Sequence, residues 1–135
     1  MAMKRSFLLL SAALLMTGTA HAARPSVDAK NQARLDKLLK GRTPGQPVSC
    51  LPVTRTSDSE TIGSTIVYRV GGTYYVNRFL DGCPALRPNT TIVSNHPTGR
   101  VCRGDIAQVF MQPPTVGIST GACAFGDFTP YPKPR

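Results

Sequence analysis

Hydrophobic and β-branched residues gather most densely between residues 64 and 79, where two arms flank Gly71-Gly72. Glycine adopts without steric cost the positive φ angles that a type I′ turn needs at both central positions. The pattern therefore predicts a β-hairpin with a two-residue loop, and the loop fixes the register of its strands. The predicted cross-strand pairs are Val70 with Thr73, Arg69 with Tyr74, Tyr68 with Tyr75, Val67 with Val76, Ile66 with Asn77 and Thr65 with Arg78.

Cross-strand partners share a face of the hairpin, so this register predicts which side chains are buried. The expected core face carries Ile66, Tyr68, Val70, Tyr75 and Phe79. The other face, which we expect to be partly exposed to water, carries Val67, Arg69, Tyr74, Val76 and Arg78. Asn77 falls opposite Ile66 on the core face, and a buried amide there should bond to the backbone of a loop. An isolated hairpin is only marginally stable, so other strands must cover its core face.

Residues 27–41 have the spacing of a short helix. Three leucines fall on one side of it, Leu35, Leu38 and Leu39. Ser26 or Asp28 can cap its start, and Gly41 suits its end. The narrow apolar stripe favours packing on the domain over binding to a membrane surface or to a partner.

Further short strands are predicted on both sides of the hairpin, at residues 48–53, 90–94, 105–111 and 121–125. Residues 105–111 also fit a short helix, and we favour a strand because Pro113-Pro114 follows. Residues 54–63 are polar and rich in turn formers, and they read as a connection. The tail, residues 129–135, has proline at every second position and should be extended without ladder hydrogen bonds. The predicted fold class is a mostly β, small disulfide-stapled antiparallel domain with one short N-terminal α-helix.

The first 22 residues have the three parts of a secretory signal peptide. Lys4 and Arg5 form the basic region, residues 7–16 are apolar, and residues 20–22 form a small-x-small cleavage site. The apolar run is shorter than the roughly 20 residues that span a bilayer. We therefore expect cleavage after Ala22 and a periplasmic or secreted mature chain. Its predicted parts are a helix and Pro/Gly linker at 23–47, a β domain at 48–128 and the Pro-rich tail at 129–135.

Four cysteines remain in the mature chain, Cys50, Cys83, Cys102 and Cys123. An even number in an exported chain of this size predicts two disulfides. Three pairings are possible, and we favour Cys50 with Cys83 and Cys102 with Cys123, because each then closes a local loop around one hairpin. Their spacing differs from that of zinc sites, and His96 is the only histidine after the leader, so we expect no metal and no cofactor.

The chain carries 16 basic and 7 acidic residues, a formal net charge of +9. Loss of Lys4 and Arg5 with the leader lowers it to 14 − 7 = +7. An anionic partner is expected, either an anionic envelope component or an acidic protein, and an exported location disfavours nucleic acid. The alternative is that the scattered positive charges only aid solubility.

The motifs L-D-K-L-L-x-G-R-T-P-G-x-P, S-C-L-P, Y-R-V-G-G-T-Y-Y-V-N-R, G-C-P-A-L, V-C-R-G-D-I and G-A-C-A-F-G-D-F-T-P-Y occur in this order. This order resembles a family of small exported proteins of alphaproteobacteria and related bacteria, classed as a domain of unknown function. The resemblance covers residues 35–131. It implies an origin in the bacterial envelope, and it implies no activity and no catalytic residue.

Arg69, Tyr74 and Arg78 form the candidate binding site, because arginine beside exposed tyrosine can hold an anionic sugar or peptide through charge and stacking. The alternative is a cross-strand cation–π pair that only supports the sheet. We expect a non-enzymatic binding module of the bacterial envelope; a small hydrolase or transferase acting on envelope polymers is the alternative. The titratable residues available to such an enzyme are Asp81, Asp105, Asp127 and His96, and no catalytic motif joins them.

Overall fold

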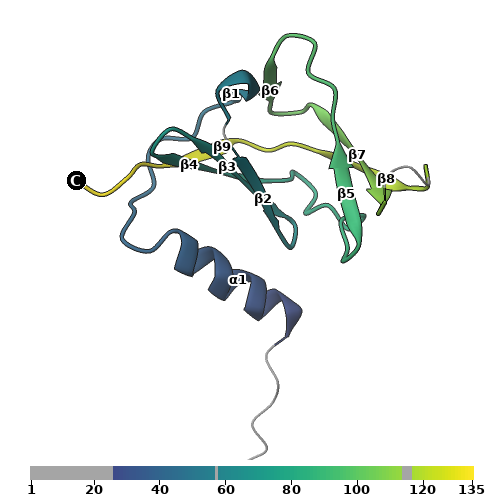
Figure 1. The fold of residues 1–135 in the computed structure, drawn as a ribbon, viewed down its shortest axis with the longest axis horizontal. Coiled ribbons are helices and arrows are strands. Elements are labelled where there is room, and N and C mark those ends of the chain that lie inside the picture. Colours follow the sequence, from purple (N-terminus) through teal and green to yellow (C-terminus); the bar gives the residue numbers. More distant parts are fainter. Residues whose placement is uncertain (1–25, 57, 114–116) are drawn as a thin grey trace, which may run out of the picture.

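Antiparallel β-sheets and one short helix make up the fold in a computed structural model, which describes residues 26–56, 58–113 and 117–135 (Figure 1). The strands form three sheets, with the orders β2-β3-β4-β9, β5-β7-β8 and β1-β6. The predicted fold class is therefore confirmed.

The central hairpin pairs β3 (Thr65–Val70) with β4 (Thr73–Arg78), and all six predicted cross-strand pairs are present. The predicted turn type is wrong. Gly71 has a φ of 57°, whereas Gly72 does not have a positive φ. Positive φ at the first central residue alone is the pattern of a type II′ turn, which also needs glycine at that position and holds the same register.

Two further strands extend this sheet where the sequence predicted none. β2 (Asp58–Ile62) pairs with β3 inside the segment expected to be a connection. β9 (Phe128–Tyr131) pairs with β4, so the first part of the tail does form a ladder, contrary to expectation. Pro130 is tolerated because β9 is the edge strand of the sheet, where a missing N–H can face outward.

The second sheet joins β5 (Thr90–Val93), β7 (Ile106–Met111) and β8 (Ser119–Ala124), which confirms three predicted strands. The third pairs β1 (Cys50–Pro52) with β6 (Arg100–Cys102), and a 3-10 turn, η1 (Val53–Arg55), follows β1. The predicted strand at 48–53 is therefore real but shorter, and β6 was not predicted.

The main core lies where the three sheets meet. Phe125 and Phe128 are fully buried, and their ring centroids lie 6.2 Å apart. Ile66 and Phe79 enter this core from the hairpin, as predicted for that face. Asn77 is 0% exposed, and its amide donates to the backbone carbonyls of Gly126 and Asp127. The predicted structural role of Asn77 is confirmed.

Helix α1 (Val27–Leu38) lies along the other face of the hairpin sheet (Figure 1). Ser26 caps its start by accepting a hydrogen bond from the Ala29 N–H, 3.2 Å away. Leu35 is 3% exposed and packs with Val67 and Val76, so the helix and sheet form a second, smaller core. The leucine stripe therefore has the packing role expected of it.

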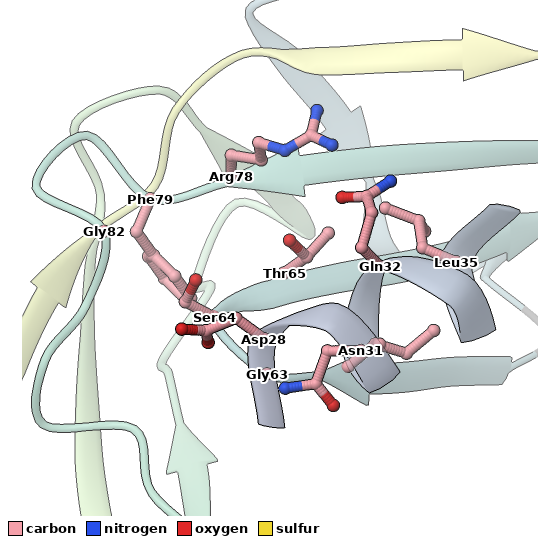
Figure 2. Close-up of a pocket in the computed structure, with 11 residues that line it drawn as sticks. Asp28, Asn31, Gln32, Leu35, Gly63, Ser64, Thr65, Arg78, Phe79 and Gly82 are labelled. Carbon is pink, nitrogen blue, oxygen red and sulfur yellow. The ribbon is translucent and has the colours of Figure 1, made fainter. Parts of the chain in front are cut away.

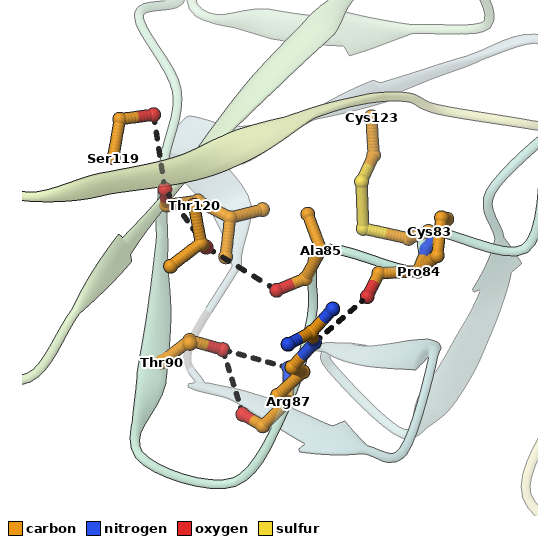
Figure 3. Close-up of a disulfide and its surroundings, with 9 residues drawn as sticks. Cys83, Pro84, Ala85, Arg87, Thr90, Ser119, Thr120 and Cys123 are labelled. Carbon is orange, nitrogen blue, oxygen red and sulfur yellow. Dashed lines mark hydrogen bonds between the residues drawn. A yellow bond between two sulfur atoms is a disulfide. The ribbon is translucent and has the colours of Figure 1, made fainter.

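The disulfides join Cys50 to Cys102 and Cys83 to Cys123. The pairing that we favoured is wrong. Cys50 and Cys102 are direct partners in the β1-β6 ladder, a contact between segments 52 residues apart that local loops do not indicate. The Cys83 bridge fastens the loop that follows the hairpin to β8 (Figure 3). The Thr120 hydroxyl reinforces this attachment by donating to the Ala85 carbonyl.

Disulfides are typical of oxidising compartments outside the cytosol. Among the residues that the structure describes, no helix is long and apolar enough to cross a membrane. The predicted signal peptide, residues 1–22, lies outside the described residues.

Candidate functional site

The helix divides the hairpin face that carries Arg69, Tyr74 and Arg78. Val67 and Val76, in the middle of this face, are 3% and 2% exposed beneath the helix, whereas Arg69 and Arg78 are exposed, so the face is partly exposed to water, as expected. Arg69 and Tyr74 are cross-strand partners near the hairpin turn, whereas Arg78 pairs with Thr65 at the far end of the strands. The structure therefore brings two of the three candidate binding residues together and separates the third.

Tyr74 has two guanidinium groups over its ring. The Arg42 Cζ atom lies 4.1 Å from the ring centroid, and the Arg69 Cζ atom lies 5.2 Å from it. Arg69 also donates from Nη2 to the Tyr74 hydroxyl at 3.2 Å. Cations over an aromatic face are attracted by its quadrupole, so the ring orders both arginines. The predicted cross-strand cation–π pair is present, and a second arginine joins it.

Arg42 reaches this ring from the predicted linker. Its Nη1 donates to the carbonyls of Gly72 and Tyr131, at 2.8 and 3.0 Å, and so connects the hairpin turn to the end of β9. The sequence did not indicate that Arg42 belongs to this site. The linker lies beside the hairpin turn only because β9, which it follows, pairs with β4. The linker follows the same strand, since the Gly45 N–H donates to the Pro130 carbonyl at 2.8 Å.

Lys133 lies beside the same turn, because a Cβ atom built on Gly72 would be 3.6 Å from the Lys133 Cβ. We call Arg42, Arg69, Tyr74 and Lys133 the basic end. The acidic residue nearest in register is Asp58, opposite Arg69 on β2. Three cations near one carboxylate leave this end of the sheet positively charged.

Arg78 lines a different hollow, of about 290 Å³, between the first turns of α1 and the β2-β3 turn (Figure 2). Asp28, Gln32, Ser64 and Thr65 supply most of its polar groups. A second hollow of about 510 Å³ adjoins it and shares Asp28 and Ser64. We call the first hollow the Arg78 groove. Arg78 therefore belongs to a polar groove at the start of the helix.

A third hollow, of about 400 Å³, opens on the sheet face opposite the helix, between the edge strands β2 and β5. Its polar lining residues are Ser59, Thr61, Tyr68, Thr91, Ser94 and His96, and its apolar ones are Val53, Ile66 and Ile92. In the β2-β3 register Ser59 is opposite Tyr68 and Thr61 is opposite Ile66, so these four side chains share one face. We call this hollow the inter-sheet cleft.

Ser94 and His96 are hydrogen-bonded in this cleft, with 2.7 Å between Oγ and Nε2. The distance suits a nucleophile and its general base. However, the His96 Nδ1 atom is buried without a hydrogen-bond partner, near the Phe125 ring. Proton transfer from the serine would therefore create an imidazolium with a buried, unpaired N–H, which is unfavourable without a partner such as the aspartate of a catalytic triad.

Burial raises the pKa of the Tyr68 phenol from 10.0 to about 12. The neutral phenol is favoured because burial penalises the phenolate. Tyr68 also packs on Phe128, with 5.9 Å between ring centroids. The side chain is therefore fixed at the cleft as a protonated hydrogen-bond donor.

The aspartates among the candidate catalytic residues have other contacts, and none of them lines the inter-sheet cleft with His96. Asp105 accepts from the Cys102 N–H at 2.8 Å, as a turn residue does, and Asp127 accepts from Arg103 Nη1 at 2.5 Å. Asp81 lines a hollow beside the Cys83–Cys123 bridge, whereas His96 lines the inter-sheet cleft. Within the described ranges, no group of three or more His, Cys, Asp or Glu side chains is arranged to hold a metal ion.

Comparisons of the chain with protein-family models, with curated proteins and with solved structures found no match.

Proposed function

We propose that this protein is a non-enzymatic binding module of the bacterial envelope, periplasmic or secreted, which holds a phosphate- or carboxylate-bearing envelope component at its basic end. The observation that carries the proposal is the placement of two guanidinium groups over the single ring of Tyr74. Assignment to a bacterial envelope rests on the sequence resemblance and on the signal-peptide pattern.

The arrangement favours an anion for two reasons. Two like charges near one ring repel each other, and an anion close to both relieves that repulsion. The ring and the hydrogen bonds of Arg42 and Arg69 also hold both side chains in place before any ligand arrives, so less conformational entropy is lost on binding. A guanidinium presents several donors in a planar fork, which matches phosphate and carboxylate oxygens.

The test compares binding of the mature protein to vesicles with anionic phospholipid and to lipopolysaccharide micelles with and without their phosphates. The variant is Arg69→Gln with Lys133→Gln, which spares Arg42 because its hydrogen bonds hold the hairpin turn to β9. At about 1 kcal/mol for each basic residue, the affinity should fall roughly thirtyfold. Binding by the unchanged protein should weaken with added salt.

Two control variants separate this site from general positive charge. Arg55→Gln with Arg100→Gln removes the same charge from exposed positions in η1 and β6. Arg78→Gln removes one charge from the far end of the same strand. An equal loss of affinity in the basic-end and η1/β6 variants would refute a local site. Loss of binding in Arg78→Gln alone would move the site to the Arg78 groove.

A further inference from the structure

We propose that the inter-sheet cleft is a second binding site, separate from the basic end, and that it takes an uncharged, hydroxyl-rich ligand of the size of a small saccharide. The cleft measures about 400 Å³, which is within the range of pockets that hold small molecules. It opens on the face of the hairpin sheet opposite the helix, whereas Arg69 and Tyr74 lie on the helix face.

The chemistry of the lining indicates the ligand class. None of the described residues that line the cleft is Asp, Glu, Lys or Arg, although the chain as a whole is strongly basic. Five of them carry a hydroxyl, namely Ser59, Thr61, Tyr68, Thr91 and Ser94. A hydroxyl both donates and accepts hydrogen bonds, and so does each hydroxyl of a sugar. An ionic ligand would lose its hydration there without gaining a charged partner.

The Ser94–His96 contact determines what the serine offers to a ligand. A neutral imidazole carries one proton, on either Nδ1 or Nε2. Nδ1 is buried without a partner, and buried unpaired N–H groups are rarer than unpaired acceptors, so the proton belongs on Nε2. Nε2–H then donates to Ser94 Oγ across 2.7 Å, and the serine's own O–H is released as a donor toward the cleft.

Tyr68 supplies a second fixed donor. Its ring is held against Phe128, and its phenol keeps its proton at every physiological pH because burial disfavours the phenolate. Val53, Ile66 and Ile92 add an apolar patch to the same lining. Sugar rings present C–H groups on their faces and hydroxyls around their edges, so a lining that combines apolar patches with hydroxyl donors fits both parts.

The experiment follows backbone amide resonances of the mature, disulfide-bonded protein by NMR during titration with neutral disaccharides, namely maltose, lactose and N,N′-diacetylchitobiose. At least one disaccharide should give saturable shifts at residues 59–61 and 91–96. Ser94→Ala and Tyr68→Phe should each weaken that binding by about threefold to tenfold, which is the effect of one lost hydrogen bond. Both variants keep the shape of the side chain, and their amide spectra report whether the fold is intact.

Ser64→Ala is the matched control, because Ser64 is an exposed serine that lines the Arg78 groove. This variant should bind like the unchanged protein. The proposal is overturned if none of the three disaccharides shifts the cleft residues, or if the affinity is the same in Ser94→Ala and Tyr68→Phe. A parallel titration uses an uncharged, acetylated peptide of alternating valine and threonine. Shifts with this peptide alone would assign the cleft to strand addition at β2 or β5, which also overturns the saccharide proposal.

Discussion

The side-chain amide of Asn77 donates a hydrogen bond of 2.8 Å to the backbone carbonyl of Gly126, a residue 49 positions further along the chain. Asn77 is 0% exposed and lies in the middle strand pair of the sheet, whereas Gly126 belongs to the segment between β8 and β9. One buried side chain therefore fastens the last connection of the chain to the central hairpin.

Replacement of this amide should be costly. Asn77→Ala removes the donor and leaves the buried Gly126 carbonyl without it, so the free energy of unfolding should fall by about 2–3 kcal/mol. Urea unfolding followed by circular dichroism measures the change. Asn95→Ala, at an exposed asparagine, is the control and should stay within about 0.5 kcal/mol of the unchanged protein. A similarly small effect of Asn77→Ala would contradict the structural role.

Gly126 should not tolerate a side chain. A Cβ atom there would come into severe overlap with the Arg78 carbonyl oxygen, and this neighbour is backbone that cannot rotate away. Gly126→Ala should destabilise the fold by about 3 kcal/mol or more. Gly72→Ala is the matched control, because its Cβ would make only an ordinary contact of 3.6 Å with Lys133 and its φ is not positive. That variant should be neutral or more stable by up to about 1 kcal/mol.

The two disulfides should each contribute to stability through the loop that they close. The bridged cysteines are 52 and 40 residues apart, and the chain-entropy model gives about 4 kcal/mol for loops of these lengths. Removal of either bridge should lower the free energy of unfolding by about 4 kcal/mol. The two variants are Cys50→Ala with Cys102→Ala, and Cys83→Ala with Cys123→Ala. Mass spectrometry of a non-reduced digest should yield peptides joined as Cys50–Cys102 and Cys83–Cys123. Peptides joined as Cys50–Cys83 would contradict the structure.

Tyr68 should make stability depend on pH in the alkaline range. Its pKa is raised from 10.0 to about 12, so between these values the folded state retains a proton that the unfolded state has lost. The unfolded state then binds fewer protons, and the free energy of unfolding falls as pH rises from 10 to 12. The decline due to Tyr68 should reach about 2 kcal/mol.

Urea unfolding at a series of pH values across this range tests the effect. Tyr68→Phe should lack that part of the decline, whereas Tyr75→Phe, which removes the tyrosine opposite Tyr68 in the hairpin, should retain it. An identical alkaline decline in the unchanged protein and in Tyr68→Phe would show that other groups cause it.

Local chemistry explains which parts of the fold were predictable. The hairpin register follows from the glycine turn alone, since a two-residue loop leaves one way to pair the arms. The burial of Asn77 followed from that register. By contrast, β2 is an edge strand, and its side chains are polar on both faces apart from Ile62. It therefore lacks the alternation of apolar and polar residues that predicts a strand.

The candidate site was predictable only in part, for a similar reason. Arg69 and Tyr74 are neighbours through the hairpin register, which the sequence reveals. Arg42 joins them through its bonds to Gly72 and Tyr131, and these depend on a ladder between β4 and a proline-containing tail. The separation of Arg78 already follows from the same register, which pairs it with Thr65 at the far end of the strands, whereas the helix that covers the face between them could not be read from the spacing along the chain.

The order of the cysteines along the chain has a consequence for biogenesis. The two bridges interleave, since Cys83 lies within the segment spanned by Cys50 and Cys102, and Cys123 lies beyond it. A chain that emerges N-terminus first and oxidises its thiols in order of appearance would join Cys50 to Cys83 and become trapped. Maturation of this protein therefore requires either folding ahead of oxidation or reshuffling of that first bridge by thiol–disulfide exchange.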